Sequence, residues 1–221
     1  MGELSTYSLT DFIPFTSEVY LRLFERLNES VWPGHLLAVA LGAAALVLAW
    51  RGRGRFWAMI LAAAWASVGY LYHLRFYVEL NWAATYFGWA FIAEAGLLAG
   101  MGLSGVFDRA GDEPTPGARI GLGVGLFAVA LFPLIALVSG RDWSGAEVFG
   151  VAPDPTVVAT LGLSLTAPRT RLLLLPIPLL WCLVTGATAW AVGTTSGVVT
   201  AAVGAGALGV AVWKKFAGSR A

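Results

Sequence analysis

Long apolar stretches separated by short polar segments are the main feature of this sequence. Six of them are long enough, or nearly so, to cross a bilayer as helices, and they cover residues 32–50, 56–72, 82–102, 120–138, 172–191 and 196–213. Many end in Trp or Tyr, as is typical of segments that end at a membrane interface. The pattern predicts an all-α helical bundle in a lipid bilayer.

A seventh apolar stretch, residues 156–168, is short, and its role decides the topology. Its 13 residues span only about 20 Å of a hydrocarbon layer of about 30 Å. If it crosses and the N-terminus lies outside, ten of the 14 basic residues fall in cytoplasmic segments and four outside. The positive-inside rule then favours seven spans with the C-terminus in the cytoplasm. The alternative is six spans around a re-entrant fifth segment, with both termini in the cytoplasm and nine basic residues inside against five outside.

The approach to this short segment is expected to be non-helical within the outer leaflet. Pro153 and Pro155 interrupt any continuous helix through it. Asp154 is suited to N-cap the helix, with Pro155 in its first position. Irregular chain at membrane depth is tolerated where protein covers it or a watery cavity meets it.

The seven-span hypothesis divides the chain into an extracytoplasmic segment (1–31), a transmembrane bundle (32–213) and a cytoplasmic tail (214–221). The first part contains an amphipathic stretch, residues 17–28, with apolar residues on one side of a helix and charged residues on the other. The apolar side is formed by Val19, Tyr20, Leu23, Phe24 and Leu27. This helix either lies in the membrane interface or packs over the outer mouth of the bundle.

Composition supports the bilayer as a partner of the chain. Hydrophobic residues make up 58% and charged residues 12%, with a mean hydropathy of +0.74, whereas soluble domains carry about 25% charged residues. The net charge of +1 argues against nucleic acid as a partner. The single cysteine, Cys182, excludes an intrachain disulfide.

Polar side chains that this topology places at or inside the membrane are the candidate functional residues, because such groups are costly there. They are His35, His73, Arg75, Glu79, Glu94, Arg141 and Asp154. All but Glu94 fall at the outer end, which predicts an outer-facing polar cavity. The two histidines, which are not at ligand spacing, are weak candidates for a metal site or a proton relay. A buried helix start at Thr156 near Arg75 or Arg141 suits an anion. In the alternative, the histidines bond to water or backbone and Asp154 caps the helix.

Glu94 lies about three turns into its segment. We expect it to face the bundle in polar company, since a lipid-facing carboxylate there costs about 2.5–3.5 kcal/mol. Small residues at four-residue spacing predict close helix packing, either within the bundle or with a partner subunit. They are Gly96 and Gly100, Gly121 and Gly125, and Gly197, Ala201, Ala205 and Gly209. Pro133, Pro176 and Pro178 predict kinks in two later segments.

Several short motifs carry a resemblance that extends roughly from Tyr7 to Trp190. They are Tyr72-His73, Asn81-Trp82-Ala83-Ala84, Glu147-Val148-Phe149-Gly150 with Pro153-Asp154-Pro155-Thr156, Leu175-Pro176, Leu180-Trp181-Cys182 and Gly186-Ala187-Thr188. Through them the chain resembles uncharacterised bacterial multi-pass membrane proteins catalogued only as a domain of unknown function. The resemblance implies a location in the bacterial inner membrane. It supplies no reaction, substrate, cofactor or catalytic residue.

Three functions remain open at this point. The leading hypothesis is a small non-enzymatic membrane protein that binds or passes a small solute or ion through the outer-facing cavity. The second is an accessory subunit of a larger membrane complex, or a homo-oligomer, which docks through small-residue faces. An intramembrane enzyme is third. A retinal protein is excluded because Lys214 and Lys215 lie at the end of the last segment, and no phosphate-binding glycine loop or thiol motif is present.

Overall fold

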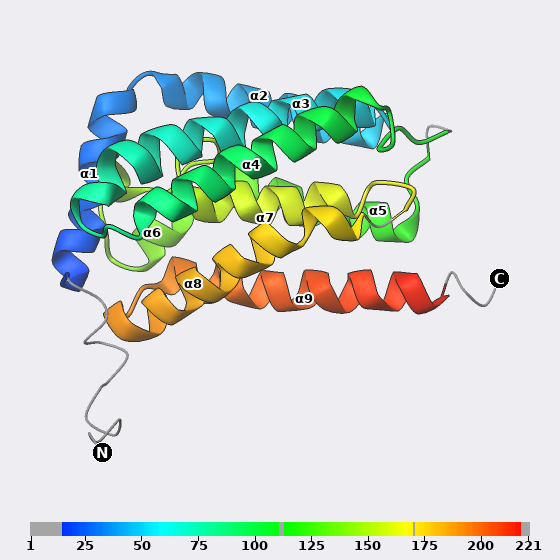
Figure 1. Cartoon of the computed structure of the whole chain (residues 1–221). Coiled ribbons are helices and arrows are strands. Elements are labelled where there is room, and N and C mark those ends of the chain that lie inside the picture. Colours follow the sequence, from blue (N-terminus) through cyan, green and yellow to red (C-terminus); the bar gives the residue numbers. More distant parts are fainter. Residues whose placement is uncertain (1–14, 111–112, 170, 218–221) are drawn as a thin grey trace, which may run out of the picture.

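Helices form nearly all of the regular structure in the computed structural model, which describes residues 15–110, 113–169 and 171–217. No strand occurs in these ranges. The longer helices lie side by side, and α1 lies across one end of them (Figure 1). The ends of the predicted first and last parts, residues 1–14 and 218–221, lie outside the described residues. The prediction of an all-α bundle is confirmed.

Each of the seven apolar segments predicted from the sequence is helical. The α-helices are α1 (Ser17–Val31), α2 (Gly34–Trp50), α3 (Gly54–Ser67), α4 (Ala84–Leu103), α5 (Pro116–Leu126), α6 (Leu134–Val138), α7 (Pro153–Ser164), α8 (Pro176–Val192) and α9 (Thr195–Ala217). Two π-helices extend α3 and α5, at Val68–Phe76 and Phe127–Leu131. Short 3-10 turns lie at Tyr77–Glu79, Trp143–Gly145 and Leu172–Leu174.

Length and hydropathy single out fewer spans than seven. Within the described chain, three continuous helices are long and apolar enough to cross a membrane: Gly54–Glu79, Ala84–Leu103 and Leu172–Val192. A fourth is added if α1 and α2, which are bent by 93° at their joint, count as one broken span. Pro116–Leu131 and Thr195–Val210 are apolar but shorter. The fold is thus an α-helical bundle with three or four helices of membrane-spanning length.

The helix α1 packs over one end of the bundle. Thr16 caps it, because its hydroxyl oxygen accepts a hydrogen bond from the Val19 amide at 3.4 Å. Its apolar side is buried except at Val19, and the Tyr20 and Tyr72 hydroxyls lie 3.4 Å apart. Phe24 packs on the ring of Tyr72 with the centroids 5.6 Å apart. The helix thus packs on the bundle, as one of the two expected arrangements requires, and its position relative to a membrane interface stays a prediction.

Glycines decide how closely several helices approach, although not always the glycines expected. Gly121 of α5 lies against the carbonyl oxygen of Gly162 in α7, as predicted for a small-residue contact. Gly96 and Gly100 make no such contact within the bundle, because a Cβ atom at either position would meet nothing within 4 Å, so of the two predicted uses only contact with a partner subunit stays open for them. The buried stripe of α4 runs through Gly88 instead, where a Cβ atom would lie 3.1 Å from the Gly69 carbonyl oxygen.

The small-residue ladder predicted for α9 packs against another helix at its N-terminal end but not at its C-terminal end. A Cβ atom on Gly197 would lie 2.6 Å from the Thr185 carbonyl oxygen of α8, whereas one on Gly209 would meet nothing within 4 Å. Gly204, which the ladder omitted, packs against Cys182. The predicted ladder therefore turns away from the contact face along α9, because a strict four-residue repeat exceeds the 3.6 residues of a helical turn.

Proline positions explain one break and correct one expectation. Pro133 separates the π-helix Phe127–Leu131 from α6, so the predicted interruption is confirmed there. Pro176 and Pro178 do not kink the interior of a helix. They lie in the first turn of α8, where the missing amide hydrogen and fixed φ of proline are tolerated.

Candidate functional site

A buried, non-helical stretch before α7 builds the centre of the candidate site. Residues 146–152 contain no helix, and most of them are buried, so the predicted interruption is confirmed. Gly150 has a φ of 74°, which favours glycine. Its amide donates to Thr156 Oγ1 at 2.9 Å, and that hydroxyl donates to the Ala152 carbonyl at 2.8 Å. These bonds tie the loop to the first turn of α7.

The role expected of Asp154 as the helix cap is wrong. The N-cap is Ala152, and Pro153 occupies the first helical position, so Asp154 lies inside the first turn. Its carboxylate accepts a hydrogen bond from Trp181 Nε1 at 2.7 Å and another from Thr185 Oγ1 at 3.0 Å. Trp181 and Thr185 are four residues apart on one face of α8. The aspartate is thus bound to a neighbouring helix, where it is 3% exposed.

A second buried carboxylate, Glu147, lies in the loop close enough to Asp154 for the two charges to interact. It is 3% exposed, and its Oε1 lies 3.5 Å from Arg141 Nη2. Burial raises the pKa of the Glu147 carboxyl above its usual range, and the charge of Asp154 raises it further. The Ser196 hydroxyl and the Arg141 guanidinium partly oppose this rise. We call the group formed by Arg141, Glu147, Asp154, Trp181 and Thr185 the acid cluster.

The acid cluster contains more negative than positive charge. Arg141 also donates to the Gly145 carbonyl at 3.2 Å, which holds its guanidinium beside Glu147. In the described part of the chain, no Lys or Arg forms an ion pair with Asp154. With both carboxylates ionised, the cluster therefore has a net charge of about −1, which is costly in a buried setting.

His73 touches the acid cluster through an aromatic ring. It is fully buried in the π-helix Val68–Phe76, with the Trp181 ring centroid 4.9 Å and the Phe91 centroid 4.5 Å away. Neither ring nitrogen has a hydrogen-bond partner among the described residues. Trp181 thus connects His73 with the acid cluster. Its ring packs in a T-shaped arrangement against the His73 ring, and its Nε1 donates a hydrogen bond to Asp154.

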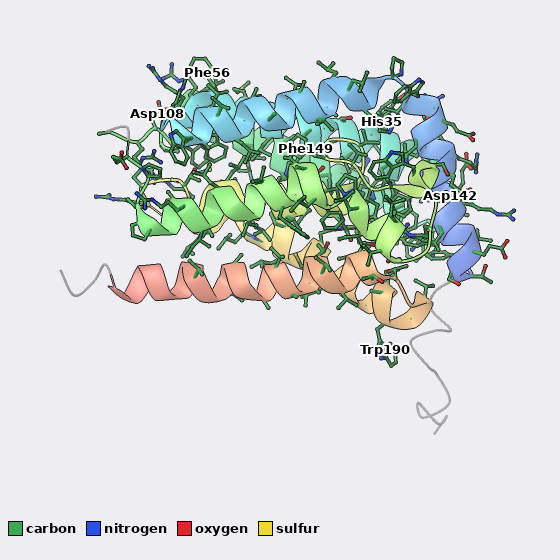
Figure 2. The ribbon with its side chains drawn as sticks, turned by 180° about the vertical axis from the view of Figure 1, so that it is seen from behind. His35, Phe56, Asp108, Asp142, Phe149 and Trp190 are labelled. Carbon is green, nitrogen blue, oxygen red and sulfur yellow. The ribbon has the colours of Figure 1, made fainter. Side chains whose placement is uncertain are left out.

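His35 lies apart from the acid cluster, in a cavity of about 680 Å³ beside the joint of α1 and α2. Figure 2 shows His35 near this joint and Asp142 at the same end of the molecule. Asn28, Glu29 and His35 supply polar groups to the lining, and most of the rest is apolar. Ala146 and Val148, which flank Glu147, also line it. This cavity is mainly apolar, and His35 is the one predicted site residue in its lining, so the expectation of a shared polar cavity stays a prediction.

Two of the predicted site residues lie on the surface instead. Glu79 forms an exposed ion pair with Arg26 at 3.1 Å. Arg75 is exposed, with its guanidinium 5.9 Å from the centroid of the Phe76 ring. Neither belongs to the acid cluster, because the turn Tyr77–Glu79 and the end of the π-helix point them away from the buried core.

The hypotheses of a metal and of an anion gain no support from the geometry. Where the structure describes the chain, no three His, Cys, Asp or Glu side chains lie together as metal ligands, and His35 and His73 are in separate places. The start of α7 holds the carboxylate of Asp154 in its first turn, with Glu147 nearby. Two carboxylates repel an anion, so the expectation of an anion site is corrected.

Glu94 faces the bundle, as predicted, and is 0% exposed. The expected polar company is not found: neither carboxylate oxygen has a hydrogen-bond partner among the residues placed in the structure. The buried stripe of α4 places it beside Phe91 and Leu98, which are apolar. Sequence pattern located the face of the helix correctly but not the neighbours that fold against it.

Three of the five residues in the acid cluster, Glu147, Trp181 and Thr185, were not predicted as site residues. In the sequence, Glu147 stands out only as part of a motif of the family resemblance, and Trp181 and Thr185 lie in an apolar run. Their spacing of four residues, with Thr188 three positions further on, is the signal that marks a polar side of α8. Of the five residues in the acid cluster, the sequence predicted two, Arg141 and Asp154, because charged residues near apolar segments are costly in a membrane.

Comparison with known proteins supports a family but no function. No curated protein and no solved structure matches the chain. One family model matches residues 17–221, and it is described as a family of unknown function, DUF6064. This match begins with α1 and includes the acid cluster and the cavity. The chain therefore belongs to this family of unknown function, as the resemblance of its motifs had indicated.

Proposed function

We propose that the protein crosses the inner membrane of a bacterium seven times and binds a proton or a small monovalent cation at the acid cluster, from the outer side. The observation that carries the proposal is the burial of two carboxylates, Glu147 and Asp154, of which Glu147 alone forms an ion pair, with Arg141. A charge imbalance in a low-dielectric setting favours the uptake of one positive charge. A proton on Glu147 or a small cation between the two carboxylates supplies it.

The course of the chain supports the seven-span part of the proposal. The end of α9 and the connection from α4 to α5 lie at one end of the bundle, and α1 lies at the other (Figure 1). In the seven-span arrangement, ten of the 14 basic residues fall in segments on the same side of the membrane as the connection from α4 to α5, which is the cytoplasmic side by the positive-inside rule. The helix α7 is short, but it is buried along its length, so other helices rather than lipid surround it.

Cysteine labelling tests this topology. In a Cys182→Ala background, we expect Gly117→Cys to react with a membrane-impermeant maleimide only after the cells are permeabilised. Ser144→Cys, in the loop before α7 and exposed, is expected to react in intact cells. The reverse result at both positions would replace the seven-span arrangement with the six-span one whose termini are both cytoplasmic.

The pH dependence of stability tests the charge uptake. Because the pKa of Glu147 is raised on folding, the folded protein binds more protons than the unfolded chain at pH values between the ordinary and the raised pKa. This contribution to stability is fully present below the ordinary pKa and is lost as the pH rises through the raised one. We expect Glu147→Gln, which cannot ionise, to flatten this part of the profile. The measurement is the thermal midpoint in detergent between about pH 4 and about pH 9.

The same variants distinguish a proton from a cation. Above the raised pKa, sodium or potassium chloride is expected to increase the thermal midpoint relative to choline chloride at equal ionic strength, if a metal cation binds the folded state. Glu147→Gln should abolish this effect, whereas the control Asp142→Asn, at an exposed carboxylate nearby, should retain it. A pH effect without a cation effect assigns a proton. Identical pH profiles for wild type and Glu147→Gln, with no cation effect, would rule out the proposed function.

A second function, as a subunit of a membrane complex or a homo-oligomer, is favoured by one observation. Gly96 and Gly100 of α4 are exposed and face open space, which leaves a flat face for another helix. We expect Gly96→Phe to dissociate a partner that copurifies in stoichiometric amount, or to convert an oligomer to a monomer in size-exclusion chromatography. Gly123→Phe, at an exposed glycine of α5, is the control. An unchanged monomer in both cases would remove this alternative.

A further inference from the structure

A turn of alternating arginine and glycine residues connects α2 with α3. We call it the arginine turn, and it consists of Arg51, Gly52, Arg53, Gly54 and Arg55. Its glycines are buried and its arginines are exposed. A Cβ atom on Gly52 would lie 2.8 Å from the Arg109 carbonyl oxygen. One on Gly54 would collide with the Phe107 carbonyl group. The glycine side of the turn therefore packs against the loop 104–110, and the arginines lie at the surface.

Hydrogen bonds hold the backbone of the arginine turn in place. The Arg109 amide donates to the Gly52 carbonyl at 3.0 Å. The Arg109 guanidinium donates to the Trp50 carbonyl at 2.7 Å. The Asp108 carboxylate accepts from the Arg55 amide at 2.9 Å, which satisfies one of the amides that the start of α3 leaves without a helical partner. None of these bonds uses the guanidinium groups of the turn itself.

Positive charge exceeds negative charge at this end of the molecule, where Figure 2 shows Phe56 and Asp108 close together. No arginine of the turn forms an ion pair with another described residue. Arg109 and Arg171 lie close by, where they bind backbone carbonyl oxygens of α2 and of the loop 104–110 rather than carboxylates. Five arginines thus share this end with the carboxylate of Asp108, and the excess positive charge attracts anions.

Exposed apolar side chains flank the arginine turn. Trp50 precedes it, Phe56 follows it, and Leu103 is the last residue of α4. A Cβ atom on Gly102 would lie 3.3 Å from the Arg55 carbonyl oxygen, which places the end of α4 beside the turn. The side chains of Trp50, Phe56 and Leu103 are 54%, 54% and 64% exposed. Arginines beside exposed aromatic rings are typical of a membrane interface, so this surface suits a ligand with a negative head group and an apolar tail.

We propose that the arginine turn binds the head group of an anionic phospholipid, whose acyl chains lie against Trp50, Phe56 and Leu103. Guanidinium groups donate paired hydrogen bonds to phosphate oxygens. A zwitterionic phospholipid has the same phosphate, but the excess arginine charge repels its ammonium group, so the anionic lipid is preferred. This interaction rests on the membrane location proposed above and not on charge uptake by the acid cluster, which is built from other elements.

Native mass spectrometry of the purified protein in detergent tests the proposal. Dioleoyl phosphatidylglycerol and dioleoyl phosphatidylcholine have the same acyl chains and differ in the charge of the head group. We expect the first phosphatidylglycerol to bind at least about tenfold more tightly than the first phosphatidylcholine. Glycerol 3-phosphate, a phosphate without acyl chains, should not displace phosphatidylglycerol at equal concentration, because it gains nothing from the apolar part of the surface.

Two triple variants locate the lipid. They are Arg51→Gln/Arg53→Gln/Arg55→Gln and its control Arg22→Gln/Arg26→Gln/Arg75→Gln. The first is expected to reduce the preference for phosphatidylglycerol to less than about twofold. The control removes the same number of exposed arginines from α1 and the end of the π-helix, and should keep the tenfold preference. Arg53→Gln alone, a milder change to the fold, should lower the preference about twofold, a third of the total on a logarithmic scale.

Each contrary result overturns the proposal in a distinct way. Equal affinity of the wild type for the two lipids would show that the turn does not select an anionic head group. A preference that survives in the first triple variant would place the lipid elsewhere on the protein. Loss of the preference in both triple variants would show an effect of net charge alone, and displacement by glycerol 3-phosphate would show a site for free phosphate.

Glu147→Gln separates this proposal from the proposed function. The substitution is expected to flatten the pH profile of stability but to leave the preference for phosphatidylglycerol unchanged, because Glu147 belongs to the acid cluster and not to the arginine turn. Loss of the lipid preference in Glu147→Gln would show that the arginine turn is not its source. An unchanged pH profile with the lipid preference intact would count against the acid cluster and support the lipid site.

Discussion

Asp154→Ala is expected to lower the free energy of unfolding by about 2–4 kcal/mol, one of the two largest effects we expect from a single substitution. The carboxylate accepts two buried hydrogen bonds, from Trp181 Nε1 and Thr185 Oγ1. Each buried donor left without an acceptor costs about 1–3 kcal/mol. Relief of the repulsion between Asp154 and Glu147 offsets part of this loss, which keeps the expected total below the sum.

Unfolding in mixed micelles with a rising fraction of dodecyl sulfate, followed by circular dichroism, measures this effect. Asp142→Ala is the matched control, because the same deletion at an exposed carboxylate should change the stability by less than about 0.5 kcal/mol. In the double variant Asp154→Ala/Trp181→Phe the loss should be smaller than the sum of the single losses, since one unpaired donor is gone. Equal stability of Asp154→Ala and wild type would show that the two hydrogen bonds contribute nothing net.

Gly121→Ala is expected to destabilise the bundle by about 1–3 kcal/mol through overpacking, less the gain of up to about 1 kcal/mol that alanine brings to a helix. The new methyl group would collide with the Gly162 carbonyl oxygen and would lie 2.9 Å from Leu165 Cβ. Backbone atoms cannot rotate away, so α5 and α7 must separate. That separation would also disturb α7, the helix that carries Asp154.

Gly123→Ala, two residues away in the same helix, is the control for this effect. A Cβ atom there would meet nothing within 4 Å, so the helix propensity of alanine should act alone and stabilise the bundle slightly. The two variants are therefore expected to change the free energy of unfolding in opposite directions under the same micelle conditions. A similar gain in both would mean that α5 and α7 are not in close contact.

Local sequence pattern was sufficient for the features that depend on neighbours along the chain. The apolar runs predicted all seven helical segments, because burial of an unbroken apolar run in lipid requires that its backbone groups bond within the segment. Pro153 predicted the break before α7, since proline cannot continue a helix on its N-terminal side. The cap was misplaced by two residues, because both Pro153 and Pro155 can occupy a first helical position and the pattern does not rank them.

The tertiary structure alone decided which of these residues meet. Asp154 and Trp181 are 27 positions apart, so no local rule connects them. Gly96 and Gly121 begin the same four-residue motif, yet Gly121 alone has a neighbouring helix. Glu94 was placed on the correct side of α4 by the cost of exposing a carboxylate to lipid, but its apolar neighbours depend on how the other helices pack. Helical periodicity determines the direction of a side chain, and the assembly of distant segments determines its partner.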